Sequence, residues 1–440
     1  MTLKCNLSNA NRQHPQPGPR AARPSDLGPE ETVHALYLHL PFCFHKCHYC
    51  DFYSVVEPAG QDAPRQAAFT DALIAEVTRR AGQVPLRPAT LFAGGGTPTY
   101  LRADYWDRLL HTLHGLGVVD RTPGRATGQE FTVEANPETV TTGLMQQLTE
   151  GGVNRVSIGA QSFDRGSLKA LERWHDPDNV PRAVEACRSA GIDNLSLDLI
   201  FAIPGQTLAM LERDLDALLA LRPNHLSTYG LTYEPNTPLS AKLRVGQVNP
   251  IGEELERHMY ELVLNKLEAN DYEHYEISNW AKRQTPVESD EVEAGAECSE
   301  APDRITTAGN QSNRCRHNLA YWHNRNWLGV GPGAASHVAG RRWRNTPNLA
   351  RYIDQAPDPP TQDHEALDAA GKFAEQLMLG LRLREGIDDA WFASHPSLRQ
   401  DQRETADECT DRGLLERVEG RLRLTRRGLF VADSIIAKLL

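Results

Sequence analysis

The sequence predicts an α/β protein: an incomplete barrel of six strand–helix units, followed by a smaller, mostly helical domain with a winged-helix-like hairpin. From residue 35 onward, short apolar runs alternate with longer amphipathic stretches, as repeated strand–helix units around a parallel sheet do. Six such units are found, fewer than a closed eight-unit barrel needs. The residues with special chemistry follow the carboxyl ends of the predicted strands, where loops are free of packing duties. A flat, doubly wound sheet is the alternative.

The predicted elements can be placed along the chain by their apolar period. Strands are expected at residues 36–40, 90–93, 131–134, 155–158, 194–200 and 225–231. Helices between them are expected at residues 67–81, 105–116, 142–150, 180–190 and 208–221. In the C-terminal region we expect an amphipathic helix at residues 373–383 and a hairpin at residues 415–424, before a final helix.

Composition divides the 440 residues into five segments. Residues 1–34 are polar and Pro-rich, and residues 284–312 are rich in Glu, Ala, Thr, Ser and Pro. Neither segment can bury enough apolar surface to offset the entropy of ordering, so we expect a disordered N-terminal extension and a disordered acidic insertion. The partial barrel then occupies residues 35–283, an aromatic and Gly-rich connector residues 313–360, and the helical domain residues 361–440.

The charge and hydropathy of the chain exclude several classes of function. The net charge of −11 argues against nucleic acid and anionic membranes as partners, although seven of the acidic residues lie at residues 285–303. Four arginines at residues 421–427 can contact phosphates, but such a run is more often a solvated hairpin edge. The sequence shows no apolar run long enough to span a membrane and no secretion signal in its first 34 residues, so we expect a cytoplasmic protein without a transmembrane segment.

Three of the eight cysteines lie within eight residues, spaced C-x3-C-x2-C as Cys43, Cys47 and Cys50. Three thiolates on one short loop can hold three corners of a cubane [4Fe-4S] cluster. The fourth iron then has no protein ligand, and a small molecule with an amino and a carboxylate group can chelate it. The alternative is zinc, with His45 or His48 as the fourth ligand. Zinc knuckles usually draw two ligand pairs from separate turns, which favours the cluster.

A second element, Gly94-Gly-Gly-Thr-Pro98, follows the second predicted strand. Glycines without side chains let the backbone approach a ligand closely. The segment lacks the G-K-[ST] of a P-loop and does not match a dinucleotide fingerprint, so taken alone it indicates only a close backbone approach.

A series of ordered motifs resembles the radical-SAM family of oxygen-independent coproporphyrinogen dehydrogenases and HemW-type haem chaperones. Besides the cysteine and glycine motifs, it comprises Tyr37-Leu-His-Leu-Pro-Phe-Cys43, Glu134-Ala-Asn-Pro137, Ser157-Ile-Gly-Ala-Gln161-Ser-Phe163, Asp198-Leu-Ile200 and Glu234-Pro-Asn-Thr237. The likeness runs from about residue 37 to the C-terminus, interrupted by the insertion. It implies a radical-SAM barrel whose open iron binds S-adenosylmethionine (SAM).

The resemblance also implies which residues form the SAM pocket. Tyr37 and Tyr49 would flank the cluster, and Glu134 would accept hydrogen bonds from the ribose hydroxyls. The methionine end would meet Gly95, Gly96 and Thr97, and the remaining pocket residues would be Gln161, Arg173 and Asp198. Without the family context, each is a buried strand-end residue or, for Arg173, a member of a surface ion pair.

Two features favour the haem chaperones within this family. The dehydrogenases of this family carry the pattern C-x3-C-x2-C-x-C, whereas this chain has Phe52 in place of the last cysteine. After the insertion, His317-Asn318-Leu-Ala-Tyr321-Trp322 matches the H-N-x-x-Y-W motif of the chaperones, where an imidazole can ligate haem iron and the aromatic rings can stack on a porphyrin. The alternative is a purely structural role, in which this motif packs between the barrel and the C-terminal region and His317 is a buried, hydrogen-bonded core residue.

The resemblance thus implies a HemW-like chaperone that binds haem and a SAM-ligated [4Fe-4S] cluster and passes haem to an acceptor protein, with an electron donor for the cluster as a further partner. The enzymatic alternative is an oxygen-independent coproporphyrinogen III dehydrogenase, which carries out oxidative decarboxylation in porphyrin biosynthesis. Whether the chain is an enzyme stays open at this point.

Overall fold

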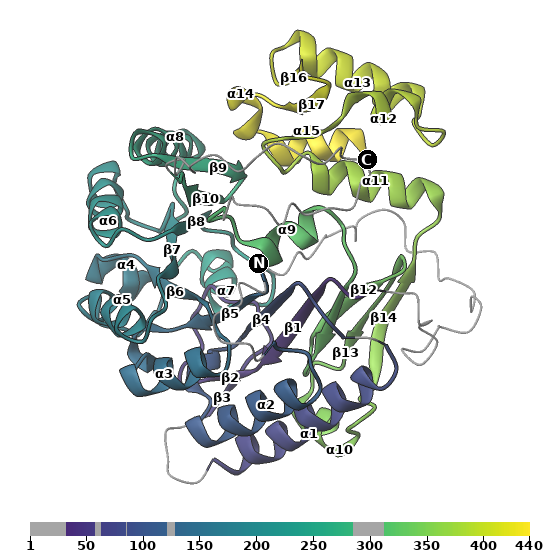
Figure 1. Ribbon diagram of the computed structural model, residues 1–440. Helices are drawn as coiled ribbons and strands as arrows, with labels where there is room; N and C mark the ends of the chain where they lie inside the picture. The colour runs from purple at the N-terminus through teal and green to yellow at the C-terminus, as the bar shows by residue number, and fades with distance from the viewer. Residues whose placement is uncertain (1–31, 58–62, 85, 121–127, 285–311) are drawn as a thin grey trace, which may run out of the picture.

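The computed structural model describes residues 32–57, 63–84, 86–120, 128–284 and 312–440 (Figure 1). The predicted N-terminal extension and acidic insertion therefore lie almost wholly outside the described residues. At the edge of the first of them, Val33 is already fully buried and the His34 amide donates to the Asn326 carbonyl (3.0 Å). The packed structure thus begins no later than residue 33.

Six parallel strands form the heart of the protein, in the order of the sequence (Figure 1). Each neighbouring pair is parallel and in register, so all six carboxyl ends meet at one rim. The strands are β1 Ala35–Leu40, β4 Thr90–Gly95, β5 Glu130–Ala135, β6 Arg155–Gln161, β7 Asn194–Phe201 and β8 His225–Gly230. They confirm the six predicted strands to within three residues at each end. Their near-continuous burial is typical of a parallel sheet covered on both faces.

Helices cover the outer face of these strands (Figure 1). Their amphipathic stripes bury the apolar positions against the sheet, for example Trp106, Leu109 and Leu113 on one turn after another. The helices are α1 Pro64–Ala81, α2 Ala103–Gly115, α3 Thr142–Glu150, α4 Arg165–Ala170, α5 Asn179–Ser189, α6 Leu208–Ala220 and α8 Glu253–Ala269. The five predicted barrel helices are confirmed, while α4 and α8 were not predicted.

The sheet continues beyond the barrel strands at both edges. Within the described residues it has twelve strands, in the order β14-β13-β12-β11-β1-β4-β5-β6-β7-β8-β10-β9, and the two ends do not pair. At one edge, β10 Asn279–Lys282 and β9 Tyr272–Glu276 are antiparallel. At the other edge, β11 Trp327–Val330 pairs parallel with β1, and β12 Ala335–Val338, β13 Arg341–Asn345 and β14 Thr361–Ala366 follow antiparallel. The predicted connector therefore contributes strands to the barrel sheet, and β14 extends it into the range assigned to the helical domain.

The C-terminal region is a small unit of helices around a three-stranded sheet (Figure 1). The predicted amphipathic helix appears as α11 Ala369–Gly380, and the predicted hairpin as β16 Leu415–Val418 and β17 Arg421–Leu424. The remaining elements are β15 Ile387–Asp388, α12 Asp389–Ser394, α13 Gln400–Asp411, α14 Arg426–Leu429 and α15 Ala432–Leu439. Helices next to a hairpin wing agree with the winged-helix-like expectation.

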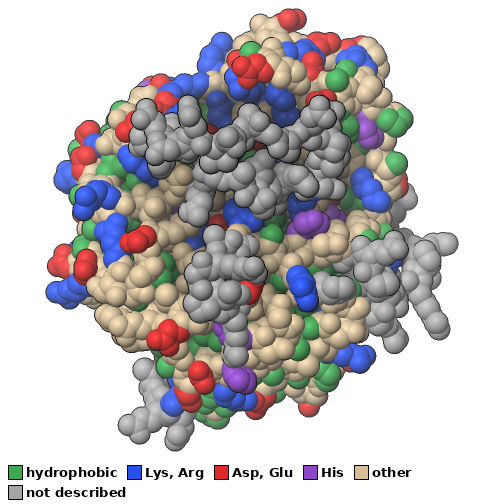
Figure 2. All heavy atoms as spheres, viewed as in Figure 1, with side chains coloured by type: hydrophobic (Ala, Val, Ile, Leu, Met, Phe, Trp, Pro, Cys, Tyr) green, Lys and Arg blue, Asp and Glu red, His purple; other side chains and the backbone are tan. Residues whose placement is uncertain are grey.

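The arginines of the hairpin have partners within the protein. Arg423 pairs with Glu416 (2.7 Å) and Arg426 with Glu268 (2.7 Å), while Arg421 donates to the Gly386 carbonyl (2.6 Å). Figure 2 shows acidic and basic side chains intermixed over this region, at the top of the view. A basic face of one sign, which phosphate binding needs, is not formed on the side shown.

A buried carboxylate ties the barrel to the added strands. Glu76 of α1 accepts hydrogen bonds from the Gly331 amide (2.9 Å), Asn345 Nδ2 (2.8 Å) and the Tyr352 hydroxyl (2.7 Å), and it pairs with Arg80 Nη2 (3.4 Å). The side chain is fully buried, and burial raises its pKa against the opposing effect of these partners. This network joins α1, the segment after β11, β13 and α10 Leu349–Asp354 into one unit.

We expect Glu76→Ala to lower the free energy of unfolding by about 3 to 5 kcal/mol, because it leaves the buried Arg80 and three donors without their acceptor. Urea denaturation of the purified protein measures this. Exposed Glu185 of α5 provides the matched control, since Glu185→Ala should change stability by only about 0.5 kcal/mol. Equal effects of the two substitutions would show that Glu76 does not join the two parts.

Candidate functional site

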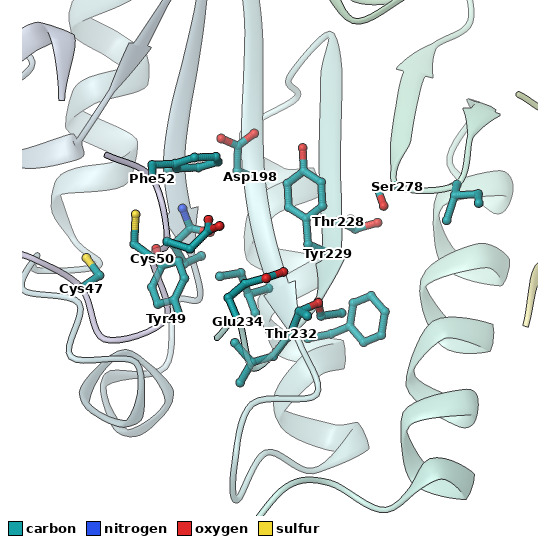
Figure 3. Close-up of a pocket in the computed structure, with 18 of the residues that line it drawn as sticks. Cys47, Tyr49, Cys50, Phe52, Asp198, Thr228, Tyr229, Thr232, Glu234 and Ser278 are labelled. Carbon is teal, nitrogen blue, oxygen red and sulfur yellow. The ribbon is translucent and has the colours of Figure 1, made fainter. Parts of the chain in front are cut away.

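A cavity of about 1410 Å³ opens at the carboxyl ends of the barrel strands. Strand ends, the cysteine loop and C-terminal helices all contribute to its walls. Figure 3 shows Cys47 and Cys50 on one side of it and Thr228, Tyr229 and Ser278 on the other. The sequence predicted functional groups at this rim, and the parallel register brings them there.

The cysteine loop is closed by a two-residue strand pair and by a lysine. β2 Phe42–Cys43 pairs parallel with β3 Val55–Val56, which holds the two arms of the loop together. Within the loop, Lys46 Nζ donates to the Phe52 carbonyl (2.6 Å) and to Ser54 Oγ (2.8 Å). The sequence analysis did not single out Lys46. Its position between two cysteines was the only available signal, and its partners are backbone and hydroxyl oxygens that no motif reveals.

All three cysteines line the cavity. Thr97 Oγ1 lies 3.5 Å from Cys43 Sγ, and Arg173 Nη1 lies 3.6 Å from Cys47 Sγ. Burial raises the pKa of Cys50 to about 11 and also raises that of Cys43. Buried thiols of this kind become thiolates when a positive metal centre takes the proton's place.

A single zinc ion and a cubane cluster place different demands on the three cysteines. Tetrahedral zinc with bonds of about 2.3 Å brings its sulfur ligands within roughly 4 Å of one another. Among the described residues, no three His, Cys, Asp or Glu side chains gather closely enough to share one metal ion. A cubane allows a wider spacing, because each thiolate binds a different iron. Moreover, His45 is engaged elsewhere: Nε2 hydrogen-bonds the Glu172 carbonyl (3.0 Å), and the ring stacks on the exposed Trp174 (3.8 Å).

The glycine turn is held directly against the cysteine loop. The Gly96 amide donates to the Leu40 carbonyl (2.8 Å), and the Thr97 amide donates to the Phe42 carbonyl (2.7 Å). A Cβ on Gly96 would lie 2.6 Å from the Pro41 carbonyl carbon, and Gly95 has a φ of +105°. Only glycine fits these two positions without moving the backbone. The glycines therefore allow the turn to pack closely against the cysteine loop, and they also leave its backbone open towards the cavity.

Two partly buried carboxylates also line the cavity. Glu134 accepts a hydrogen bond from the Gly95 amide (3.1 Å), and Asp198 accepts one from Ser157 Oγ (3.1 Å). Burial raises the pKa of both. Arg173 Nη2 donates to the Gly159 carbonyl (3.0 Å), which places its guanidinium between the strand end and Cys47. The site thus offers carboxylate acceptors for hydroxyl or amino groups and one partly buried cation.

The cavity brings together most of the residues expected for the cluster and SAM. Its lining includes Cys43, Cys47, Cys50, Tyr49, Gly95, Gly96, Thr97, Glu134, Gln161, Arg173 and Asp198. Tyr37 is absent from the lining. Its hydroxyl hydrogen-bonds His39 Nδ1 (3.0 Å), and its ring stacks on Phe92 at a centroid distance of 6.3 Å. Tyr37 lies within β1, below the strand end that leads into the cysteine loop, and its place beside the cluster stays a prediction.

The H-N-x-x-Y-W residues are not part of this cavity's lining. They form α9 Arg316–Trp322, whose His317 is only 2% exposed. His317 Nδ1 hydrogen-bonds Thr90 Oγ1 (2.8 Å) and Nε2 hydrogen-bonds the Tyr321 hydroxyl (3.1 Å). Thr90 is the first residue of β4, so α9 sits at the opposite end of the strands from the cysteines. Both ring nitrogens are occupied, which matches the packing interpretation of this motif.

The other two residues of the motif face the neighbouring elements. Asn318 Nδ2 donates to the Tyr275 hydroxyl (3.4 Å) in β9. Trp322 packs against Leu379 and Leu383, and Arg382 lies over its ring at 5.3 Å. α9 thus joins the barrel interior to the region around α11.

Comparison with known proteins identifies the family. Residues 37–218 match the Radical SAM superfamily, and residues 367–431 match the HemN C-terminal domain. Heme chaperone HemW from Bacillus subtilis is 31% identical over 415 residues, which cover 92% of this chain and 98% of that protein. The chain belongs to the HemW family. Heme chaperone HemW from Escherichia coli is also 31% identical over 415 residues, covering 91% of this chain and 97% of the relative.

A solved structure confirms the fold class. Coproporphyrinogen III oxidase (HemN) from Escherichia coli matches with a TM-score of 0.71 at 19% identity, covering 94% of this chain and 92% of that one. At this identity the likeness shows the shared fold alone. Membership of the Radical SAM superfamily implies a [4Fe-4S] cluster and SAM for HemW proteins. Within the described residues, no helix is long and apolar enough to cross a bilayer.

The burial of His317 predicts a pH effect on stability. Burial lowers its pKa to about 3, whereas an unfolded histidine titrates near about 6.5. The unfolded chain therefore binds a proton that the folded chain excludes, and stability falls as the pH drops below about 6.5, by about 1.4 kcal/mol per unit. Between pH 7 and 5, the wild type should lose about 2 kcal/mol more than His317→Gln, measured by denaturation. Other histidines are common to both proteins and cancel. Identical pH profiles would contradict a neutral, buried His317.

Proposed function

We propose that this protein is a haem chaperone of the HemW type, which binds haem, carries a SAM-ligated [4Fe-4S] cluster and transfers haem to an acceptor protein. The observation that supports it most is the near full-length likeness to proteins named heme chaperone HemW. Because this likeness spans both the barrel and the C-terminal domain, it concerns the whole cavity and not the cysteine loop alone.

In this proposal Cys43, Cys47 and Cys50 hold the cluster. The three cysteines line the same cavity, and three thiolates from one loop fit three corners of a cubane. With SAM bound, the cluster supplies one-electron chemistry at its open iron. The loop itself keeps the sulfurs in place: Lys46 ties its arms, and Thr97 and Arg173 each lie beside a sulfur.

The SAM site in this proposal is the inner half of the cavity. The Gly95-Gly96 backbone is accessible there, and Glu134 and Asp198 offer oxygen acceptors for the ribose hydroxyls and the amino group. Gln161 has a φ of +61° at the β6 bulge, so its backbone turns into the cavity. Since thiolate ligands require a reducing compartment, we also propose that the protein works in the cytoplasm, with a reductant for the cluster and a haem acceptor as its partners.

Phe52 is the residue that favours the chaperone over the dehydrogenase. It stands at the position where the dehydrogenase pattern has a further cysteine, and Figure 3 shows it beside Cys50. Its carbonyl accepts the Lys46 hydrogen bond that closes the loop. A phenyl ring at this position offers no thiol, so any chemistry that depends on a fourth cysteine of the loop is absent here.

Removal of any one loop cysteine should abolish the cluster. After anaerobic reconstitution we expect about four irons and four sulfides per wild-type chain and less than a tenth of this in Cys43→Ala, Cys47→Ala or Cys50→Ala. Cys187 is buried in α5, away from the cavity, so Cys187→Ala should retain the wild-type content. Zinc without sulfide in the wild type would contradict the cluster.

The chaperone and the enzyme differ in two measurements on the reconstituted protein. We expect saturable haem binding by absorbance titration, and no sustained conversion of coproporphyrinogen III when SAM and a chemical reductant are supplied without oxygen. Absence of haem binding would refute the chaperone. Repeated turnover of coproporphyrinogen III would instead support the dehydrogenase, because a chaperone does not decarboxylate its cargo.

A further inference from the structure

The cavity extends well beyond the residues that surround the cysteines. At about 1410 Å³ it exceeds the roughly 300 to 1,000 Å³ of a site for one small ligand, so it has room for a second molecule beside SAM. Its outer wall comes from α8, α14 and α15, which belong to different parts of the chain. The apolar side chains of this wall are Tyr260, Phe430, Val431, Ile436, Ala437 and Leu440.

The outer wall has the chemistry of a site for a large flat ligand. Phe201, Tyr260 and Phe430 form a continuous aromatic series, with ring centroids 5.8 Å and 5.7 Å apart. Phe201 and Tyr260 are buried, so Phe430 is the member of the series whose ring can contact a ligand with an extended π system. Val431 is 42% exposed even though it lines the cavity, so this apolar surface is open to a ligand.

Charged groups stand at the edge of the apolar wall. Arg257 and Arg382 both line the cavity, and they pair with Glu261 (3.1 Å) and Asp433 (2.8 Å). Three members of these pairs are more than 40% exposed, so an arginine can exchange its partner for a ligand carboxylate at little cost. Glu253 and Glu256 line the same rim, which directs a ligand carboxylate towards the arginines.

The α9 motif lacks these properties. His317 is buried with both nitrogens hydrogen-bonded, and it lies at the opposite end of the strands from the cysteines. A flat ligand of tetrapyrrole size would have to displace α9 from the barrel to reach it. α9 does, however, contact α11 through Trp322, and Met378 and Arg382, at the end of α11 and just after it, line the cavity.

We propose that the outer half of this cavity, between the barrel rim and α15, is the tetrapyrrole site of the protein. The inference rests on the proposed chaperone function and deepens it. The ring is held by its faces against Phe430, Val431 and the part of α15 around Ala437, and by its carboxylates at Arg257 or Arg382. His317 anchors α9 on the barrel through Thr90 and makes no bond to the iron.

The test compares two tryptophan substitutions on α15. Ala437 is exposed and lines the cavity, so Ala437→Trp fills the proposed site, whereas exposed Lys438 does not line it, so Lys438→Trp is the matched control. In the reconstituted full-length protein, haem titration should show binding weakened at least tenfold by Ala437→Trp and changed less than twofold by Lys438→Trp. Both should retain wild-type iron and sulfide, which shows that the fold and the cluster are intact.

Two further measurements separate this site from α9. Metal-free protoporphyrin IX should displace haem from the wild type, because the ring faces and carboxylates carry the recognition, and His317→Gln should bind haem within threefold of the wild type. Wild-type affinity in Ala437→Trp, failure of protoporphyrin IX to compete, or loss of haem binding in His317→Gln with its cluster intact would each overturn the proposed site. A wild type that binds no haem would overturn the proposed function itself.

Discussion

The functional rim depends on one backbone contact, in which the glycine turn after β4 is joined to the cysteine loop after β1. The amides of Gly96 and Thr97 donate to carbonyls on either side of Pro41, and a side chain at residue 96 would collide with the Pro41 backbone. This contact holds the start of the cysteine loop at the mouth of the barrel, and Lys46, the short β2–β3 pair and the hydrogen bond of His45 to the Glu172 carbonyl support the rest of the loop. Every chemical property of the inner cavity follows from that placement.

The regular part of this architecture could be predicted from the sequence because its signals are local. Strands such as β7 carry apolar residues at every second position or more often, and helices such as α2 bury one stripe, so period and length locate both to within a few residues. β11 to β14 escaped prediction because they have only four to six residues and mostly polar or mixed sequences, and they join the sheet only because β11 pairs with the distant β1. Tertiary contacts with distant residues determine their structure, and a short stretch of sequence does not show these contacts.

The site could be predicted where the spacing of residues in a motif indicates what the motif binds. Three cysteines on one loop and a run of glycines can be recognised in the sequence, and both motifs line the same cavity in the structure. Tyr37 and His317 show the limit: an aromatic or imidazole near a motif says nothing about which way the side chain points. Tyr37 turns towards His39, and His317 turns towards Thr90 and Tyr321. The outer wall was invisible because Ala437 and Val431 belong to an ordinary amphipathic helix and the residue before it.

The parallel pair of β1 and β11 has a consequence for how the molecule is made. Ala35 pairs with Trp327, so the first strand waits for a partner nearly three hundred residues away. Until that partner has left the ribosome, β1 presents an open, apolar edge, the kind of surface that invites mispairing with other chains. Pairing over such a separation is slow, and slow closure prolongs the exposure. The nascent barrel is therefore the stage at which this protein most needs protection from aggregation.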